Sequence, residues 1–158
     1  MYTKKGGFTL IELMATIVLM GIISVMVGHV LLNGYQNFIT SQTISQTDWK
    51  GLLVLERMSN DIHTIRSAND ISTIGANQLV FIDVNSNTVQ YQLSGNSLLR
   101  NSQTLVNGIQ SFNLSYLDKN GSVTAVPSFV RYVLISVAIA QDNLAQSYST
   151  MAATRGML

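Results

Sequence analysis

The hydrophobic and polar positions divide the chain into three stretches. Residues 8–32 form an apolar run that contains a single acidic residue, Glu12, and a single histidine, His29. About 20 apolar residues in a helix suffice to cross the hydrocarbon layer of a membrane, because each residue adds about 1.5 Å. The run therefore predicts a transmembrane helix over 8–32.

The second stretch, residues 33–66, is more polar and has helical spacing. No proline lies between residues 8 and 66, so a single helix of about 85 to 90 Å is possible. Apolar residues at every third or fourth position predict a stripe that packs against a sheet. The stripe consists of Leu52, Leu55, Met58, Ile62 and Ile65. Four charged residues lie mostly off the stripe and are expected to face solvent: Glu56, Arg57, Asp61 and Arg66.

From Asp70 onward the apolar positions alternate, which predicts strands. The first three are expected at 79–84, 89–93 and 97–100, as an antiparallel meander joined by short polar turns. Asn120-Gly121 predicts a hairpin between strands at 109–117 and 122–126. Residues 130–140 are apolar enough for a central strand buried on both faces. Residues 147–155 are expected to form a last strand that closes the sheet. The preceding residues 142–146 could instead form a turn of helix.

The whole pattern predicts an α+β fold. A long N-terminal helix spans the membrane with its first half and carries an antiparallel sheet domain on its second half. Basic residues set its orientation. Lys4 and Lys5 precede the apolar run, whereas the next charges after it are Asp48 and Lys50. Since basic residues stay on the cytoplasmic side, we expect a cytoplasmic N-terminus and a C-terminal domain on the other side of the membrane.

Small residues next to the apolar run indicate how it is processed. No site such as Ala-x-Ala follows Leu32, whereas the pair Gly6-Gly7 lies between the lysines and the run. A secretory signal peptide would place the small residues on the far side of its apolar core. A cut at Gly7 would instead leave the membrane helix in the mature protein.

The segment from Lys4 to Glu12, KKGGFTLIE, resembles the class III signal of type IV prepilins and pseudopilins. The resemblance implies cleavage between Gly7 and Phe8 by a bacterial prepilin peptidase and N-methyltransferase, then methylation of Phe8. It implies assembly with other minor and major pilin-like subunits through the N-terminal helix, on an inner-membrane assembly platform and in contact with membrane lipid. The segments would be a leader over 1–7, the membrane helix over 8–32, its periplasmic continuation over 33–66 and a sheet domain over 67–158.

Glu12 lies in the membrane run and needs a compensating partner. An ionised side chain at the centre of a bilayer costs about 2.5 to 3.5 kcal/mol on insertion scales. In the proteins that the chain resembles, the carboxylate at this place is thought to meet the amino terminus of a neighbouring subunit. Glu12 and Phe8 are therefore expected to act in subunit assembly. The alternative is a monomeric membrane-anchored periplasmic binding domain that uses the helix only as a tether.

A weaker resemblance covers the second half. The segments 55–62, 98–101 and 112–121 are similar to J-type minor pseudopilins and PilW-like minor pilins. Major pilins commonly close their C-terminal region with a disulfide, whereas this chain has no cysteine. The resemblance thus implies a minor subunit that primes or caps a filament. A type II secretion pseudopilus and a type IV pilus, including one for DNA uptake, both remain open.

Catalysis and nucleic-acid binding are not indicated. The nine basic residues are scattered and balanced by eight acidic ones, whereas a phosphate-binding surface needs clustered positive charge. His29 and His63 belong to no recognisable catalytic motif, so we predict a structural protein rather than an enzyme. Residues 118–121, Asp-Lys-Asn-Gly, are similar to part of a calcium loop but lack its bidentate glutamate. A hairpin is favoured there, and no metal or cofactor is expected.

Overall fold

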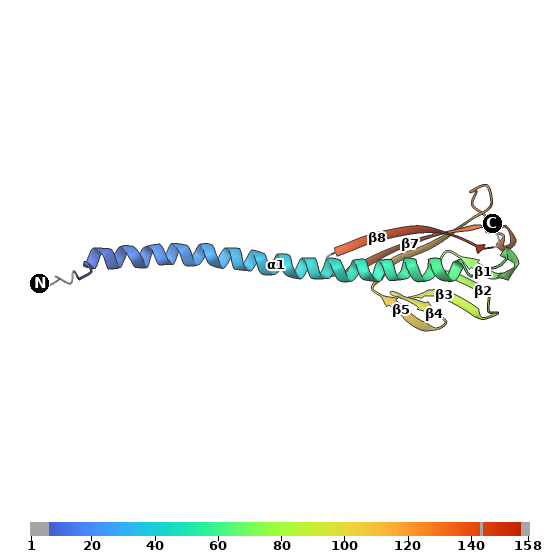
Figure 1. Cartoon of the computed structure of the whole chain (residues 1–158), viewed down its shortest axis with the longest axis horizontal. Coiled ribbons are helices and arrows are strands. Elements are labelled where there is room, and N and C mark those ends of the chain that lie inside the picture. The colour runs from blue at the N-terminus through green and yellow to red at the C-terminus, as the bar shows by residue number, and fades with distance from the viewer. Residues whose placement is uncertain (1–6, 143, 156–158) are drawn as a thin grey trace, which may run out of the picture. The chain divides into compact units, whose positions relative to one another are not determined.

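The computed structural model describes residues 7–142 and 144–155. The chain forms two compact units that divide after Gln42. One helix, α1 (Leu10–Ile62), contributes to both units, and a 3-10 turn, η1 (Ala68–Asp70), and antiparallel strands follow it (Figure 1). This order of elements confirms the predicted α+β fold.

The strands form two sheets, whereas the sequence predicted one. Sheet A has the order β1-β2-β3-β4-β5, and sheet B has the order β6-β7-β8 with a 3-10 turn, η2 (Pro127–Phe129), before β7. The strands of sheet A are β1 (Ile71–Gly75), β2 (Gln78–Ile82), β3 (Thr88–Ser94), β4 (Ser97–Arg100) and β5 (Gln103–Asn107). The strands of sheet B are β6 (Ile109–Leu117), β7 (Tyr132–Gln141) and β8 (Leu144–Ala153).

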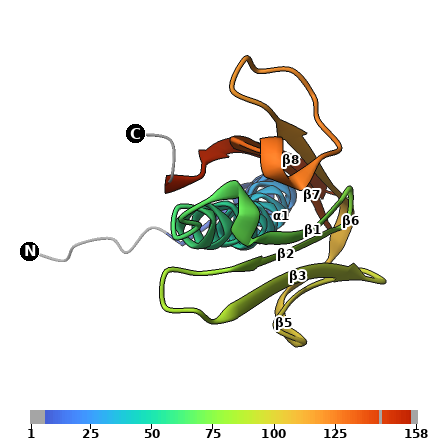
Figure 2. The same ribbon diagram turned by 90° about the vertical axis from the view of Figure 1, so that its right-hand side faces the viewer.

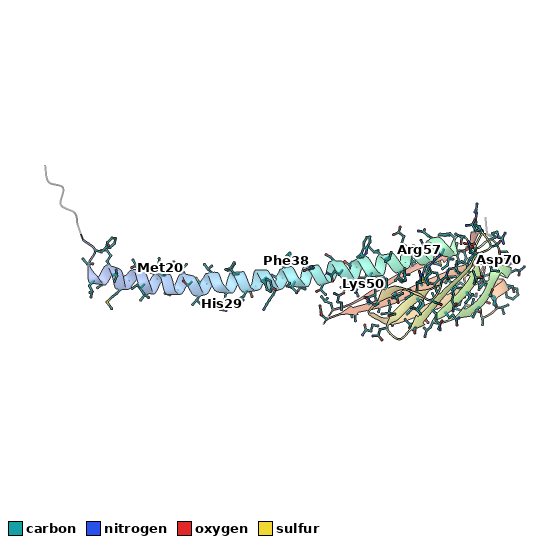
Figure 3. All side chains as sticks on the ribbon, turned by 90° about the horizontal axis from the view of Figure 1, so that it is seen from below. Met20, His29, Phe38, Lys50, Arg57 and Asp70 are labelled. Carbon is teal, nitrogen blue, oxygen red and sulfur yellow. The ribbon has the colours of Figure 1, made fainter. Side chains whose placement is uncertain are left out.

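In the N-terminal unit, α1 exposes large apolar side chains along residues 10–32. Such a helix is stable only in lipid or inside other protein. Its N-terminal part is long and apolar enough to cross a membrane, and none of that part is buried within the chain. Figure 3 shows Met20 and His29 projecting from this part of the helix. The described structure thus agrees with a membrane-anchored helix.

Polar side chains in this part of α1 bond to their own helix. The hydroxyl of Thr16 donates to the carbonyl oxygen of Leu13 at 2.8 Å, and that of Ser24 to Met20 at 2.7 Å. His29 Nδ1 lies 3.3 Å from the carbonyl oxygen of Val25. Lipid offers no hydrogen-bond partners, so this local bonding makes the polar residues compatible with the membrane.

In the C-terminal unit, sheets A and B lie on two sides of α1 (Figure 2). The core joins residues from all three layers, and among its fully buried side chains are Val54 and Met58 from α1, Phe81 and Tyr91 from sheet A, and Ile135 from sheet B. Burying an apolar side chain of this size stabilises the fold by about 1.5–3 kcal/mol. The second half of α1 is therefore the middle layer of the domain.

The buried face of α1 differs from the predicted stripe. It consists of Thr43, Thr47, Gly51, Val54, Met58 and Ile62. Met58, Ile62 and Ile65 are buried as predicted, but Leu52 is 57% exposed. The prediction counted only apolar residues, whereas the ring of Tyr148 packs directly over Gly51. Glycine at this position permits that close contact, which places Leu52 outside the core.

The predicted meander is confirmed, since β2, β3 and β4 pair as antiparallel neighbours. Strands β1 and β5 were not predicted. The strand predicted at 122–126 is wrong, because only an isolated bridge joins Leu117 to Val123. Instead β6 pairs with β7 along its length. Strand β7 is central in sheet B as predicted, but it is fully buried on one face only.

Strand β8 begins at Leu144, paired with Gln141 of β7. The alternative of a helical turn over 142–146 is therefore wrong. At the tip of this hairpin Asp142 has a φ of 55°, a left-handed conformation that aspartate tolerates in tight turns. The same tip contacts the helix, since Lys50 Nζ donates to Gln141 Oε1 at 2.9 Å. The contact holds sheet B against α1.

Candidate functional site: the start of helix α1

Glu12 lies in the first turn of α1 and bonds with Thr9, the residue before the helix. The Thr9 backbone N–H donates to Glu12 Oε2 at 3.4 Å, and the Thr9 hydroxyl lies 3.5 Å from the same oxygen. In return, the Glu12 backbone N–H donates to the Thr9 hydroxyl oxygen at 3.4 Å. This reciprocal arrangement is a capping box, and it adds to the bond that the Glu12 N–H donates to the Thr9 carbonyl oxygen at 3.1 Å.

The capping box gives Glu12 a role within its own chain that sequence reasoning missed. Thr9-Leu10-Ile11-Glu12 is a Thr-x-x-Glu pattern, so the signal was present in the sequence. The carboxylate also lies at the positive end of the helix dipole, which favours a negative charge by about 0.3–1 kcal/mol at an exposed site. These bonds engage Oε2, and the structure shows no bond to Oε1 within residues 7–142 and 144–155.

Gly7 and Phe8 precede the helix in a segment that is neither helix nor strand. The Phe8 side chain is 81% exposed, and no atom of the described residues other than the chain neighbours of Gly7 lies within 4 Å of the place of a Cβ on Gly7. The peptide bond between them is therefore open to a partner. Lys4, Lys5 and Gly6, which belong to the same expected signal, lie outside the described residues.

Comparison with known families bears on this segment. Residues 2–28 match a family model described as the prokaryotic N-terminal methylation motif. This motif indicates a type IV pilin-like precursor. It implies processing by a prepilin peptidase and assembly with other pilins. Gly7, Phe8, Thr9 and Glu12 all lie inside the matched range. No curated protein and no solved structure matches the chain.

Elsewhere in the chain, the loop that is similar to part of a calcium loop forms hydrogen bonds within itself. Asp118 Oδ1 accepts the backbone N–H groups of Asn120 at 2.8 Å and Ser122 at 2.9 Å. Gly121 has a φ of 78°, which suits glycine, and its N–H donates to the Asp118 carbonyl oxygen at 3.0 Å. Asp118 thus stabilises a tight turn. Among the residues that the structure describes, no three His, Asp or Glu side chains gather as metal ligands do.

Asp61 is the residue whose environment departs most from the predicted solvated face. Its Oδ2 accepts hydrogen bonds from Tyr91 Oη at 2.7 Å and from Arg100 Nε at 2.6 Å, and its side chain is only 13% exposed. Burial, with the adjacent carboxylate, raises the pKa of Tyr91 well above its usual value. The hydrogen bond to Asp61 likewise raises the pKa of Arg100. The cluster ties α1 to β3 and β4, so its role is structural.

Proposed function

We propose that this chain is a minor subunit of a type IV pilus or a type II secretion pseudopilus. Cleavage between Gly7 and Phe8 removes the leader, and methylation of the new Phe8 amino terminus follows. The helix over 8–32 stays in the bacterial inner membrane, with the sheet domain on the periplasmic side, until the subunit joins a filament. The observation that carries the proposal is the methylation motif at residues 2–28, continuous with an apolar helix that is unburied within the chain.

Glu12 is the proposed assembly residue. Its Oε2 holds the capping box, which leaves Oε1 available for the amino terminus of a neighbouring subunit. Pairing in the membrane relieves two charges that lipid would otherwise leave uncompensated. Because the carboxylate is fixed to the helix start by Thr9, the pair would also set the axial position of one subunit against the next.

The minor role is supported by the absence of cysteine, since major pilins commonly close their C-terminal region with a disulfide. In that role the subunit would prime or cap the filament. The rival function is a monomeric periplasmic binding domain on a membrane tether. A hollow of about 370 Å³ lined by Asp118, Lys119, Phe129 and Arg131 is the feature that favours it. That hollow lies among loop residues, of which Lys119 and Phe129 are exposed, and the Asp118 carboxylate is already bonded within its own turn. The subunit is therefore the better supported function.

The N-terminus of the mature protein decides between these functions. The full chain would be expressed with and without a prepilin peptidase, and its N-terminal peptide would be measured by mass spectrometry. The subunit function predicts a peptide that begins with methylated Phe8, seen only with the peptidase and lost in Gly7→Val. Gly34→Val is the matched control, since it changes a glycine outside the signal. A chain that keeps Met1 in the presence of an active peptidase overturns the proposal.

A further inference from the structure

The outer edge of strand β8 lacks the features that usually prevent an edge strand from pairing with another chain. It pairs with β7 from Ala153 to Leu144 without a register shift and is the outer strand of sheet B. Its ten residues include no charged residue and no proline. Exposed edges usually carry a charge, a proline or a bulge that prevents pairing with another chain. The edge of β8 has none of these.

The backbone groups that β8 turns outward can be assigned from its C-terminal end. Thr154 donates its N–H to the Arg131 carbonyl oxygen, towards β7, whereas Arg155 donates to Ile65, away from it. Because the direction alternates along an antiparallel strand, odd-numbered residues of β8 face outward. Ser147 and Ser149 are therefore placed to bond with an added strand.

The flank of α1 next to this edge exposes the apolar Leu52 between the charged residues Asp48 and Glu56. Tyr148 of β8 packs over Gly51, and its hydroxyl donates to Asp48 Oδ1 at 2.5 Å. Leu52 lies one helical turn beyond Asp48 on the side away from the core, and it is exposed. Figure 2 shows sheets A and B on two sides of α1 and no described strand over the remaining side. A strand added outside β8 would cover Leu52.

Strand β5, the outer strand of sheet A, is the matching edge. Its sequence, Gln-Thr-Leu-Val-Asn, is also free of charge and proline. Uncharged edges can pair with each other without charge repulsion. In its pairing with β4, the register shifts so that Leu105 has no partner. This bulge shortens the straight part of β5, so we expect a contact of a few residues.

The direction of the two edges selects how they can meet. Strand β8 runs parallel to α1, because the preceding Gln141 contacts Lys50 and the following Arg155 contacts Ile65. Strand β5 runs the opposite way. It begins next to Arg100, which binds Asp61 near the helix end, and leads to Gly108, whose carbonyl oxygen accepts from Ala140 beside the hairpin tip.

We infer that the β8 edge of one copy of this chain pairs with the β5 edge of a second copy, antiparallel, and covers Leu52. The inference rests on the proposed function, in which filament subunits lie side by side with their sheet domains in the same direction. In that orientation β8 and β5 are antiparallel. Pairing of β8 with β8 about a twofold axis would instead direct the two helices oppositely.

Disulfide cross-linking tests the pairing, because the natural chain has no cysteine. Two differently tagged full-length copies would be expressed together with a prepilin peptidase, one carrying Ser149→Cys and the other Thr104→Cys. Oxidation of the membranes is expected to give the mixed dimer. The pairs Ser149→Cys with Ser149→Cys, and Ser149→Cys with Ser122→Cys, are expected to give none.

Blocking variants separate strand pairing from mere proximity. With Ser147→Cys as the reporter on β8, Ser149→Pro removes an outward N–H without touching the bonds to β7, and it should abolish the mixed dimer. Ser149→Ala keeps the N–H and should preserve it. A mixed dimer that persists with proline, or a β8-to-β8 dimer of equal yield, overturns the inference. The inference is also overturned if no cross-link forms in protein whose N-terminal mass shows normal processing. If the protein is not processed at all, the result counts against the proposed function instead.

Discussion

Gly51 shows how a single residue without a side chain sets the packing of a helix. The ring of Tyr148 occupies the space that a Cβ would fill, so α1 turns Gly51, rather than Leu52, towards sheet B. A stripe drawn from apolar residues alone misses this, because glycine and two threonines form the first half of the buried face. The partner ring lies about a hundred residues away in the chain, so local sequence could not reveal it.

Gly51→Ala is expected to lower the free energy of unfolding by about 1–3 kcal/mol, because the new methyl group overlaps the Tyr148 ring. Urea unfolding of the full chain in detergent measures this. Gly34→Ala is the matched control in the same helix, where nothing lies within 4 Å of the new methyl group. It should be neutral or stabilising by up to about 1 kcal/mol, since alanine favours helix more than glycine does. Equal stability of the two variants would contradict the packing described for Tyr148.

Thr9→Val removes the hydroxyl that accepts from the Glu12 backbone N–H, which then keeps only its bond to the Thr9 carbonyl oxygen at 3.1 Å. The loss of an N-cap side chain costs about 0.5–2 kcal/mol, so the first turn of α1 should fray. Amide hydrogen exchange at Glu12 in micelles is expected to accelerate in Thr9→Val and to stay slow in Thr9→Ser. Unchanged exchange in both variants would show that the capping box contributes nothing to the helix start.

Asp61→Asn keeps the shape of the side chain but removes the charge that Arg100 and Tyr91 contact. Hydrogen bonds to charged groups contribute about 1.5–3 kcal/mol. The free energy of unfolding should fall by a similar amount, and thermal unfolding should therefore begin at a lower temperature. Arg57→Gln is the control, because Arg57 lies 3.7 Å from Asp61 and is about half exposed. Its effect should stay below about 1 kcal/mol. If Arg57→Gln lowered the stability more than Asp61→Asn does, the structural role described for Asp61 would be refuted.

At the scale of elements, periodicity predicted the long helix and most of the strands, because each has an extended apolar pattern of its own. The sequence of strand β1, Ile-Ser-Thr-Ile-Gly, alternates too little between apolar and polar residues to predict a strand. It forms a strand because it pairs with β2. The segment 122–126 has suitable residues, but it meets the outer edge of β6 only near Leu117, because the Leu114 N–H farther along that edge donates to Ala76. Pairing between elements therefore decided the cases in which local pattern was insufficient.

Tyr116 joins the two sheets and makes their contact sensitive to alkali. Its hydroxyl oxygen lies 2.8 Å from the Gly75 carbonyl oxygen and 2.9 Å from that of Gln78. Burial raises the pKa of Tyr116 to about 12. Because this pKa is raised above the unfolded value of about 10, the phenol stabilises the fold fully below pH 10, and the contribution is lost between about pH 10 and 12.

The free energy of unfolding should therefore fall steeply from about pH 10 to 12 in the natural chain. In Tyr116→Phe the stability should be lower at neutral pH, because a buried carbonyl group loses its donor, and the fall above pH 10 should be smaller. Denaturant titrations at a series of pH values give both quantities. A variant with the same alkaline slope as the natural chain would assign the pH dependence to other groups.

At the scale of the whole molecule, the sequence predicted the N-terminal signal well, because every residue of the motif lies in one continuous segment. Glu12 stood out as an acid in an apolar run, whereas the role of Asp61 depended on Tyr91 and Arg100, which only the fold brings to it. The sequence thus predicted features that lie within one continuous segment. It did not predict sites that the fold assembles from several elements.

Glu12→Gln tests the proposed role of this carboxylate in assembly. It should leave membrane insertion and cleavage at Gly7 unchanged, because a neutral side chain enters lipid more easily than a charged one. Incorporation into filaments should fail, as measured by the amount of the chain in sheared filament fractions. Glu12→Asp, which keeps the charge on a shorter side chain, is expected to retain part of the activity. Normal incorporation of Glu12→Gln would show that the carboxylate is not needed for assembly.

The second half of helix α1 is the middle layer of the core, and this has a mechanical consequence. Any tension applied along residues 43–62 acts directly on Val54, Met58 and Ile62, which are buried in that core. Displacing this part of the helix would remove its core contacts with both sheets at the same time. The domain should therefore resist pulling up to a sharp threshold and then fail as a unit.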